Sequence, residues 1–182
     1  VAVLRMSKNK VLSWIAKAYI EILRGTPVLL QLYFFWLGLP KLVPMLEPSD
    51  TQCIVVALIV NSSAYIAEVI RAGIGAVDIG QWEAARSIGL SERHVMSKII
   101  MPQAIKNILP ALGNEFISML KGTSLASVFF VGELMTSFKS VQSATFLPVP
   151  SLIIVGIIYF ILNFILSKLV QLLERRLKQS DR

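Results

Sequence analysis

Two stretches of this chain, residues 51–70 and 152–170, are apolar over nearly the ~20 residues that an α-helix needs to cross a bilayer. Charged residues make up only 16% of the sequence, against about 25% in an average soluble domain. Hydrophobic residues make up 55%, and the mean hydropathy is +0.69. The sequence therefore predicts an all-α integral membrane protein.

Two further apolar stretches complete the predicted membrane domain. Residues 28–46 follow Pro27 and are aromatic at their centre. Residues 108–138 would form a straight helix of about 46 Å, longer than the ~30 Å hydrocarbon core, so we expect a break at Gly122. Membranes tolerate interrupted helices where these line a cavity or pack against protein. We therefore expect four visible transmembrane helices in a single domain, residues 1–182.

The segments that flank these runs are more polar. Residues 10–24 form a predicted amphipathic helix, which either lies at the membrane surface or packs against its neighbours. The proline-rich residues 40–48 and residues 140–150 are expected to be loops, and residues 171–182 form a charged tail.

Basic residues are distributed unevenly. Of the 18 lysines and arginines, all but Lys41, Lys121 and Lys139 lie at the two ends of the chain or in its central loop. Because Lys and Arg concentrate on the cytoplasmic side of membrane proteins, the visible termini and the central loop are predicted to be cytoplasmic. We attribute the net charge of +7 to this orientation, and we expect contact with lipid and not with nucleic acid.

The central loop, residues 78–101, predicts a helix, a glycine corner and a second helix. Asp78 or Gly80 can cap the first helix, and Ser91 can cap the second. Gly89 can end the first helix because glycine tolerates a left-handed backbone. On physical grounds alone, this hairpin either docks into a groove on another protein or simply connects two spans.

Charged side chains inside spans are costly and tend to be functional. Four need an explanation here: Glu68, Glu115, Lys121 and Glu133. Lys121 lies at the expected break, where its ammonium group either holds the carboxylate of a substrate or pairs with Glu115 or Glu68 for structure alone. For Glu68 and Glu115 themselves we favour a packing or network role.

Neutral polar residues accompany these charges. Thr123 and Ser124 lie directly after the expected break and offer hydroxyl groups. Asn61, Ser62 and Tyr65 can present polar groups on one face of the second span. Small polar residues also serve simply to pack membrane helices together, so both interpretations remain open for these residues.

The sequence lacks the features of an enzyme. No nucleophile has a histidine partner in a plausible setting, and no glycine-rich phosphate loop ending in Gly-Lys-Ser/Thr is present. We therefore expect the chain to bind no cofactor, and any ATP-driven work needs a partner. Cys53 is the single cysteine, so no disulfide within the chain is possible, and no metal site is indicated.

Short motifs with defined spacing occur through nearly the whole chain. In the central loop, Glu83-Ala84-Ala85 is followed by Gly89, and Pro102 closes the pattern. The other motifs are Tyr19-Ile20-Glu21-x-x-Arg24-Gly25-Thr26-Pro27, Gly38-Leu39-Pro40, Ala64-Tyr65-x-Ala67-Glu68-x-x-Arg71-Ala72-Gly73, Gly80-Gln81-Trp82, Pro102-Gln103-Ala104 and Leu120-Lys121-Gly122-Thr123-Ser124-Leu125. Together they resemble the polar amino acid permease branch of the ABC importers, whose "EAA" loop has the same spacing. Met101 stands where the family usually has Leu, a near-isosteric change.

The resemblance implies a type I ABC importer permease fold, with the central loop as a cytoplasmic coupling-helix hairpin. Family members usually have five spans, so we expect the first family helix to be missing from the four visible here. Two such subunits, alike or different, would form the pathway in a bacterial plasma (inner) membrane. ATP-binding cassette ATPase subunits would dock below, and an extracytoplasmic binding protein would deliver the amino acid.

The resemblance also implies roles for individual residues. The residues implied in ATPase coupling are Glu83, Ala84, Ala85, Gly89, Trp82 and Arg86. Those implied in substrate binding are Lys121 for the α-carboxylate, Thr123, Ser124, Asn61 and Ser62 nearby, and Thr26 and Met119 as weaker candidates. Some members carry an acidic residue after the lysine; Gly122 stands here instead, which argues against a pocket for a cationic substrate.

Two other classes of protein compete with this interpretation. An ATP-independent secondary transporter would use Glu68, Glu115 and Lys121 as ion or proton sites, but the internal inverted repeat that would support it is not evident. A membrane scaffold would use the central loop to recruit a cytoplasmic protein, and it would show no substrate-dependent behaviour.

Overall fold

The computed structural model describes residues 1–7 and 9–179, and this part of the chain is helical without any β-strand. Lys8 and Arg182, two of the basic residues at the chain ends, lie outside the described residues. The elements are α1 (Ala2–Arg5), α2 (Lys10–Gly25), α3 (Val28–Leu42), the 3-10 turn η1 (Pro44–Leu46), α4 (Asp50–Gly75), α5 (Ile79–Ser87), α6 (Glu92–His94), the π-helical η2 (Val95–Ile100), α7 (Met101–Gly122), the 3-10 helix η3 (Thr123–Phe129), α8 (Leu134–Thr145) and α9 (Pro148–Gln179).

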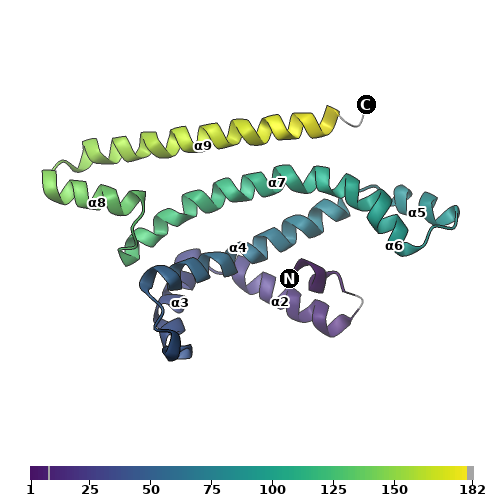
Figure 1. The fold of residues 1–182 in the computed structure, drawn as a ribbon, viewed down its shortest axis with the longest axis horizontal. Coiled ribbons are helices and arrows are strands. Elements are labelled where there is room, and N and C mark those ends of the chain that lie inside the picture. The colour runs from purple at the N-terminus through teal and green to yellow at the C-terminus, as the bar shows by residue number, and fades with distance from the viewer. Residues whose placement is uncertain (8, 180–182) are drawn as a thin grey trace.

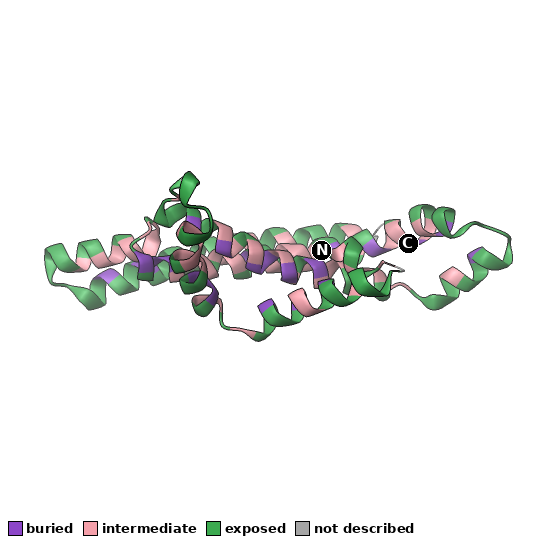
Figure 2. Cartoon of the chain, turned by 90° about the horizontal axis from the view of Figure 1, so that it is seen from below, coloured by how far each residue is buried: buried purple, intermediate pink, exposed green. Residues whose placement is uncertain are grey.

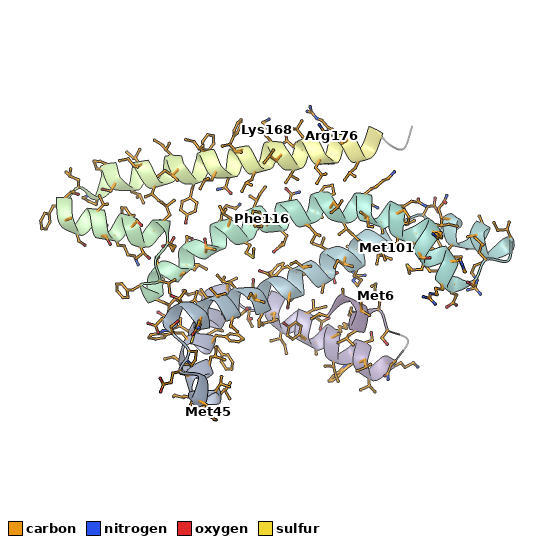
Figure 3. All side chains as sticks on the ribbon, viewed as in Figure 1. Met6, Met45, Met101, Phe116, Lys168 and Arg176 are labelled. Atoms are coloured by element: carbon orange, nitrogen blue, oxygen red, sulfur yellow. The ribbon has the colours of Figure 1, made fainter. Side chains whose placement is uncertain are left out.

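Three long helices form the body of the molecule. α7 lies between α4 and α9 and contacts both, while α2 and α3 pack against α4 (Figure 1). The α5–α6 hairpin projects from one end of this body, and α8 lies at the opposite end (Figure 1). Met45, which is 97% exposed, marks the tip of the arm formed by α3 and η1 (Figure 3).

Two glycines allow the long helices to approach closely. A Cβ atom on Gly73 of α4 would overlap the side chain of Ile108 on α7. A Cβ atom on Gly113 of α7 would lie 2.6 Å from Cγ2 of Val170 on α9. Membrane helices use small residues in this way to bring their backbones together.

Buried positions follow the lines of contact between helices, and the outer faces are exposed (Figure 2). One buried cluster joins Leu32 of α3, Ile54 and Ala57 of α4, and Ala126 and Phe129 of η3. α9 is different, because only 11% of its most apolar 18-residue stretch is buried against the rest of the protein. A helix that is apolar on nearly all sides is typical of a membrane span.

The four predicted transmembrane segments correspond to two single helices and two bent pairs. Among the described residues, α4 and α9 are each long and apolar enough to cross a membrane alone. α2 and α3 qualify only as a pair bent by 108°, and the stretch Glu92–Phe129 qualifies together with α8 across a bend of 46°. The first predicted span is therefore the second half of a bent pair that begins with the amphipathic helix.

The helix is interrupted in two steps near the predicted break: the bend of 46° lies at residues 130–133, and the helix type changes at Gly122. α7 ends there, and the backbone tightens into the 3-10 helix η3. After Phe130, whose φ of 55° is left-handed, α8 begins with a cap. The Glu133 carboxylate accepts hydrogen bonds from the amides of Met135 at 2.8 Å and Thr136 at 2.6 Å. Glu133, which the sequence left unexplained, thus serves as a helix N-cap.

Several predicted boundaries are wrong, including the start of the predicted loop 40–48, since residues 40–42 belong to α3. The first span does not continue to residue 46, because α3 ends at Leu42 before Pro44, and proline disfavours helical backbone in the residue before it. Residues 140–145 are not a loop but the second half of α8. Its end is set by Phe146 in a left-handed conformation, φ 57°, and Pro148 then opens α9, a position where its missing N–H costs nothing.

The amphipathic helix α2 packs against its neighbours, one of the two alternatives that the sequence left open. Ile20 is buried against Ala64 and Ala67 of α4. The hydroxyl groups of Tyr19 and Ser63 lie 2.7 Å apart across the same contact. The first half of the bent pair is therefore fixed to α4.

Candidate functional site

The central loop folds into the predicted helix, corner and helix. α5 begins after Asp78, whose carboxylate accepts a hydrogen bond from the Gly80 amide at 2.7 Å. Ser91 precedes α6 as predicted, but the side-chain cap expected of it is not formed. Its hydroxyl instead lies 2.8 Å from Nδ1 of His94, which competes for the same oxygen.

Gly89 makes the corner between the two helices, with a left-handed φ of 83°. The Gly89 amide donates to the Arg86 carbonyl at 2.9 Å, and the Leu90 amide donates to the Ala85 carbonyl at 3.2 Å. These two bonds are those of a Schellman C-cap, which satisfies carbonyls at the end of a helix. The corner therefore depends on a backbone conformation that favours glycine.

A small core holds this hairpin together. Ala85, Val95 and Ile100 are buried in it, and Trp82 packs against them. Ala85 and Trp82, both implied in coupling by the family resemblance, thus face the chain's own interior. Their position suits a role in orienting α5.

The other side of α5 is open. Glu83 and Ala84 are exposed, and Ile79 and Ile88 at the two ends of α5 are 68% and 78% exposed. Arg86, also exposed, forms an ion pair with Glu92 at 3.5 Å. The exposed face of α5 therefore presents the Glu83 carboxylate among small and apolar side chains, with the exposed Arg86–Glu92 ion pair beside it.

A first cavity, of about 250 Å³, lies between α3, α4 and α7. α4 contributes Asn61, Ser62 and Tyr65 to its lining, and α7 contributes Glu115 and Met119. The Ser62 hydroxyl donates to the Met119 sulfur at 3.0 Å. We call this space the α4–α7 cavity.

A second and larger space, of about 780 Å³, lies between α7, η3 and α9. Lys121, Ser124, Tyr159 and Asn163 are among its lining residues. The Oδ1 atom of Asn163 is buried without a hydrogen-bond partner. Within the described part of the chain, the Lys121 ammonium has no hydrogen bond or ion pair, so the pairing with Glu115 or Glu68 considered above is not formed. We call this space the α7–α9 groove.

The seven residues implied in substrate binding do not meet in one place. Asn61, Ser62 and Met119 line the α4–α7 cavity, Lys121 and Ser124 line the α7–α9 groove, and Thr123 and Thr26 line neither. The Thr123 and Ser124 hydroxyls donate at 2.7 Å to the carbonyls of residues 120 and 121. The two spaces flank the same turn of α7, because Gly122 lines the smaller one.

Thr26 belongs to a buried network that sequence analysis missed. The Gln31 amide donates to the Leu23 carbonyl at 2.7 Å and to the Thr26 hydroxyl at 2.8 Å. Its oxygen accepts a hydrogen bond from Nδ2 of Asn61 at 2.9 Å. The network ties the 108° bend between α2 and α3 to α4. A glutamine within the apolar run 28–46 was the available signal.

Glu68 lies in the charge network that we expected. Both of its carboxylate oxygens accept hydrogen bonds from Arg71, and Arg24 lies 3.9 Å away. The Arg24 guanidinium also lies over the Tyr65 ring, 5.5 Å from its centroid. These charges neutralise one another close to the α4–α7 cavity.

An all-helical membrane body, interrupted helices around polar spaces and an exposed helical hairpin at one end together define a membrane permease. The chain belongs to the family described as "binding-protein-dependent transport system inner membrane component", whose model matches residues 1–179. It is therefore a helical, multi-pass component of an inner membrane transport system.

Curated relatives and a solved structure agree with this family. The chain is 41% identical over 168 residues to the arginine transport system permease protein ArtQ of Bacillus subtilis (strain 168), covering 92% of this chain and 76% of that protein. It is 42% identical over 180 residues to the probable glutamine ABC transporter permease protein GlnM of the same organism, covering 99% and 82%. A crystal structure of an amino acid ABC transporter with histidines matches with a TM-score of 0.89 and 47% identity, covering 96% of this chain and 81% of that one. None of these findings supports an ATP-independent secondary transporter.

Proposed function

We propose that this chain is the membrane-spanning subunit of an ATP-driven amino acid importer and forms half of its translocation pathway. The family supports a binding-protein-dependent permease, and the names of the relatives and of the solved structure support amino acids as the substrate class. The observation that carries the proposal is the exposed face of α5, held rigidly on a permease body by its own core and glycine corner.

In this proposal, α5 is the contact with an ATP-binding cassette ATPase. Glu83 and Ala84 contact the partner directly, and Arg86 takes part through its exposed side chain. Ala85 and Trp82 act from inside by fixing the angle of α5, and Gly89 acts through the corner. ATP is hydrolysed by the partner, and this chain contributes the docking surface.

The pathway itself is completed by a second permease subunit, identical or different. The hairpin and the visible termini are placed in the cytoplasm, following the distribution of Lys and Arg. α8 lies at the end opposite the hairpin (Figure 1). We therefore place the extracytoplasmic binding protein at the α8 end.

For the substrate, we assign the α-carboxylate to Lys121. Its ammonium is unpaired in the described chain and stands at the break of α7, beside the α7–α9 groove. Thr123 and Ser124 stabilise the break through their hydroxyl groups, and Thr26 acts through the Gln31 network. Asn61, Ser62 and Met119 act from the other side of the same turn.

The ATPase contact is tested by pull-down from detergent-solubilised membranes. Glu83→Lys should lose the co-purifying ATPase while membrane insertion is retained. Glu21→Lys, a charge reversal at a 65% exposed carboxylate on α2, is the matched control and should retain it. If Glu83→Lys retains the ATPase as well as the wild type does, Glu83 is not part of the contact.

The carboxylate assignment is tested by uptake. Lys121→Met should abolish ATP-dependent amino acid uptake and leave ATPase co-purification intact. Lys10→Met, at an exposed lysine near the N-terminal end of α2, should leave both unchanged. Normal uptake by Lys121→Met would remove Lys121 from the substrate site.

A further inference from the structure

One side of α9 carries aromatic and basic residues in a line. Phe160, Phe164, Lys168 and Arg175 are all exposed, and their spacings of four and seven residues place them within one narrow sector of the helix. We call these four residues the α9 stripe. Val170, which contacts α7, lies on a different side of α9. Because α9 is long and apolar enough to cross a membrane alone, the stripe is positioned to meet lipid.

Lys168 is held in place by neutral groups. The rings of Phe160 and Phe164 are stacked, with centroids 6.0 Å apart. Nζ of Lys168 lies 5.4 Å from the centroid of the Phe164 ring, which attracts it, and 3.5 Å from Oε1 of Gln171. Within the described residues, neither Lys168 nor Arg175 forms an ion pair. The stripe therefore presents positive charge that the chain itself does not neutralise.

The two basic residues of the stripe lie at the depth of lipid headgroups. Pro148, the first residue of α9, precedes Lys168 by about 20 residues, and these span about 30 Å of helix, the thickness of the hydrocarbon core. Lys168 therefore lies at the boundary of the core when α9 crosses the bilayer from its first residue. Arg175 lies about 10 Å further along the axis. The headgroup layer begins at this boundary, so the two side chains reach it from either side.

A small cavity lies between these two basic residues. Its volume is about 150 Å³, and Lys168, Gln171, Leu172 and Arg175 line it. The guanidinium and ammonium groups supply charge-assisted donors for phosphate oxygens, and the Gln171 amide adds a neutral donor. Leu172 and the stacked rings offer an apolar surface for an acyl chain beside the cavity. The orientation of a span requires positive charge alone, whereas this arrangement adds a cavity and an aromatic stack.

We propose that the α9 stripe and this cavity bind an anionic phospholipid. The phosphate lies between Lys168 and Arg175, and an acyl chain lies along Phe164 and Phe160. Clusters of basic residues at the end of a membrane span recognise anionic lipids in this way. The inference goes beyond the proposed function, because it requires only that α9 spans the membrane.

Lipid binding is measured on the purified permease complex after detergent washing has removed its native lipids. Native mass spectrometry gives the apparent dissociation constant of the first lipid bound per copy of this chain, for phosphatidylglycerol and for phosphatidylcholine with the same acyl chains. The double variant Lys168→Gln/Arg175→Gln removes both charges of the cavity. Lys10→Gln/Arg176→Gln is the matched control, since it also removes two exposed charges and neither residue lines the cavity. Arg176 lies on the same half of α9 as Lys168 (Figure 3).

The wild type should bind phosphatidylglycerol about 25-fold more tightly than phosphatidylcholine, since each basic residue near the membrane surface contributes about fivefold. Lys168→Gln/Arg175→Gln should lose this preference, and the control should retain it. Lys168→Arg/Arg175→Lys keeps both charges and should retain most of the preference. Phosphatidylglycerol should also raise the melting temperature of the wild-type complex more than phosphatidylcholine does, a readout that needs no variant.

Two further measurements separate the lipid from other occupants. Glycerol 3-phosphate carries the charged group without acyl chains, and it should not displace phosphatidylglycerol. A photocrosslinker attached through the thiol of Phe164→Cys should capture lipid in the native membrane. The chain's own thiol, Cys53, is buried and does not compete for the reagent.

Five results would overturn the inference. They are a wild type without preference for phosphatidylglycerol, an unchanged preference in Lys168→Gln/Arg175→Gln, an equal loss in its control, displacement by glycerol 3-phosphate, and a crosslink from Phe164→Cys to another subunit of the complex. The displacement would point to a soluble phosphate as the ligand. The crosslink would show that protein, and not lipid, covers this side of α9.

Discussion

The corner at Gly89 gives the sharpest test of how the hairpin is built. Its φ of 83° lies in the region that residues with a Cβ atom avoid. A Cβ atom placed there would meet no heavy atom within 4 Å. Gly89→Ala therefore changes the backbone preference alone, without a steric clash.

The expected magnitude follows from two opposing effects. An L-residue in the left-handed conformation costs about 1–2 kcal/mol. Replacing glycine also lowers the entropy of the unfolded segment, which offsets about 0.4–1 kcal/mol. We expect a net loss near 1 kcal/mol, so the two capping bonds should open about five times more often. Gly89→Asn should lose less, because Asn visits the left-handed region more readily.

Hydrogen exchange of the purified complex measures this opening. The Leu90 amide, bonded to the Ala85 carbonyl, should exchange about fivefold faster in Gly89→Ala, and co-purification of the ATPase should fall. Gly75→Ala is the control, since a Cβ atom there also meets open space but φ is not positive. Unchanged exchange in Gly89→Ala, or an equal change in the control, would refute the reasoning.

Three further predictions concern the helices that support the two spaces. Gly73→Ala should overpack the contact with Ile108 and destabilise the complex by about 1–3 kcal/mol, seen as a lower melting temperature. Gln31→Leu should leave the Asn61 amide unpaired, at about 1–3 kcal/mol, and lower the melting temperature as well. Glu133→Ala should cost about 0.5–2 kcal/mol at the start of α8, visible as faster exchange of residues 135 and 136.

Control variants or a distinct exchange pattern test each of these three predictions. Gly38→Ala, where a Cβ atom meets nothing within 4 Å, should not lower the melting temperature, and equal loss there would remove close packing as the cause of the Gly73 effect. Gln142→Leu changes a half-buried glutamine on α8 and should cost less than Gln31→Leu. For Glu133→Ala, exchange that accelerates throughout α8 and α9 rather than in the first turn would contradict a capping role.

The hairpin was predictable because its determinants are neighbours in the chain. Asp78, Gly89 and the break at Gly122 act through backbone groups within a few residues, so their residue types already indicate where helices begin and end. Ser91 shows the limit of this reasoning. A histidine three residues later takes the hydroxyl group that a cap would use.

The arrangement of the polar residues was not predictable in the same way. Gln31 and Asn61 are thirty residues apart, and they meet only because α3 bends and packs on α4. The family resemblance grouped Lys121 with Asn61 and Ser62, but the structure places Lys121 and those two residues in separate spaces beside one turn of α7. The side of a helix that faces a given neighbour depends on the packing of both helices.

By itself, the sequence determined the membrane character of the chain, its helical class, the hairpin and the family, because hydropathy, capping residues and motif spacing are properties of consecutive residues. The tertiary structure decided which charges meet and which polar residues share a space. Close packing at Gly73 and Gly113 sets how α4, α7 and α9 face one another. That packing pairs Glu68 with arginines and brings Glu115 to the lining of the α4–α7 cavity, because electrostatic pairing depends on distances in space that no local pattern encodes.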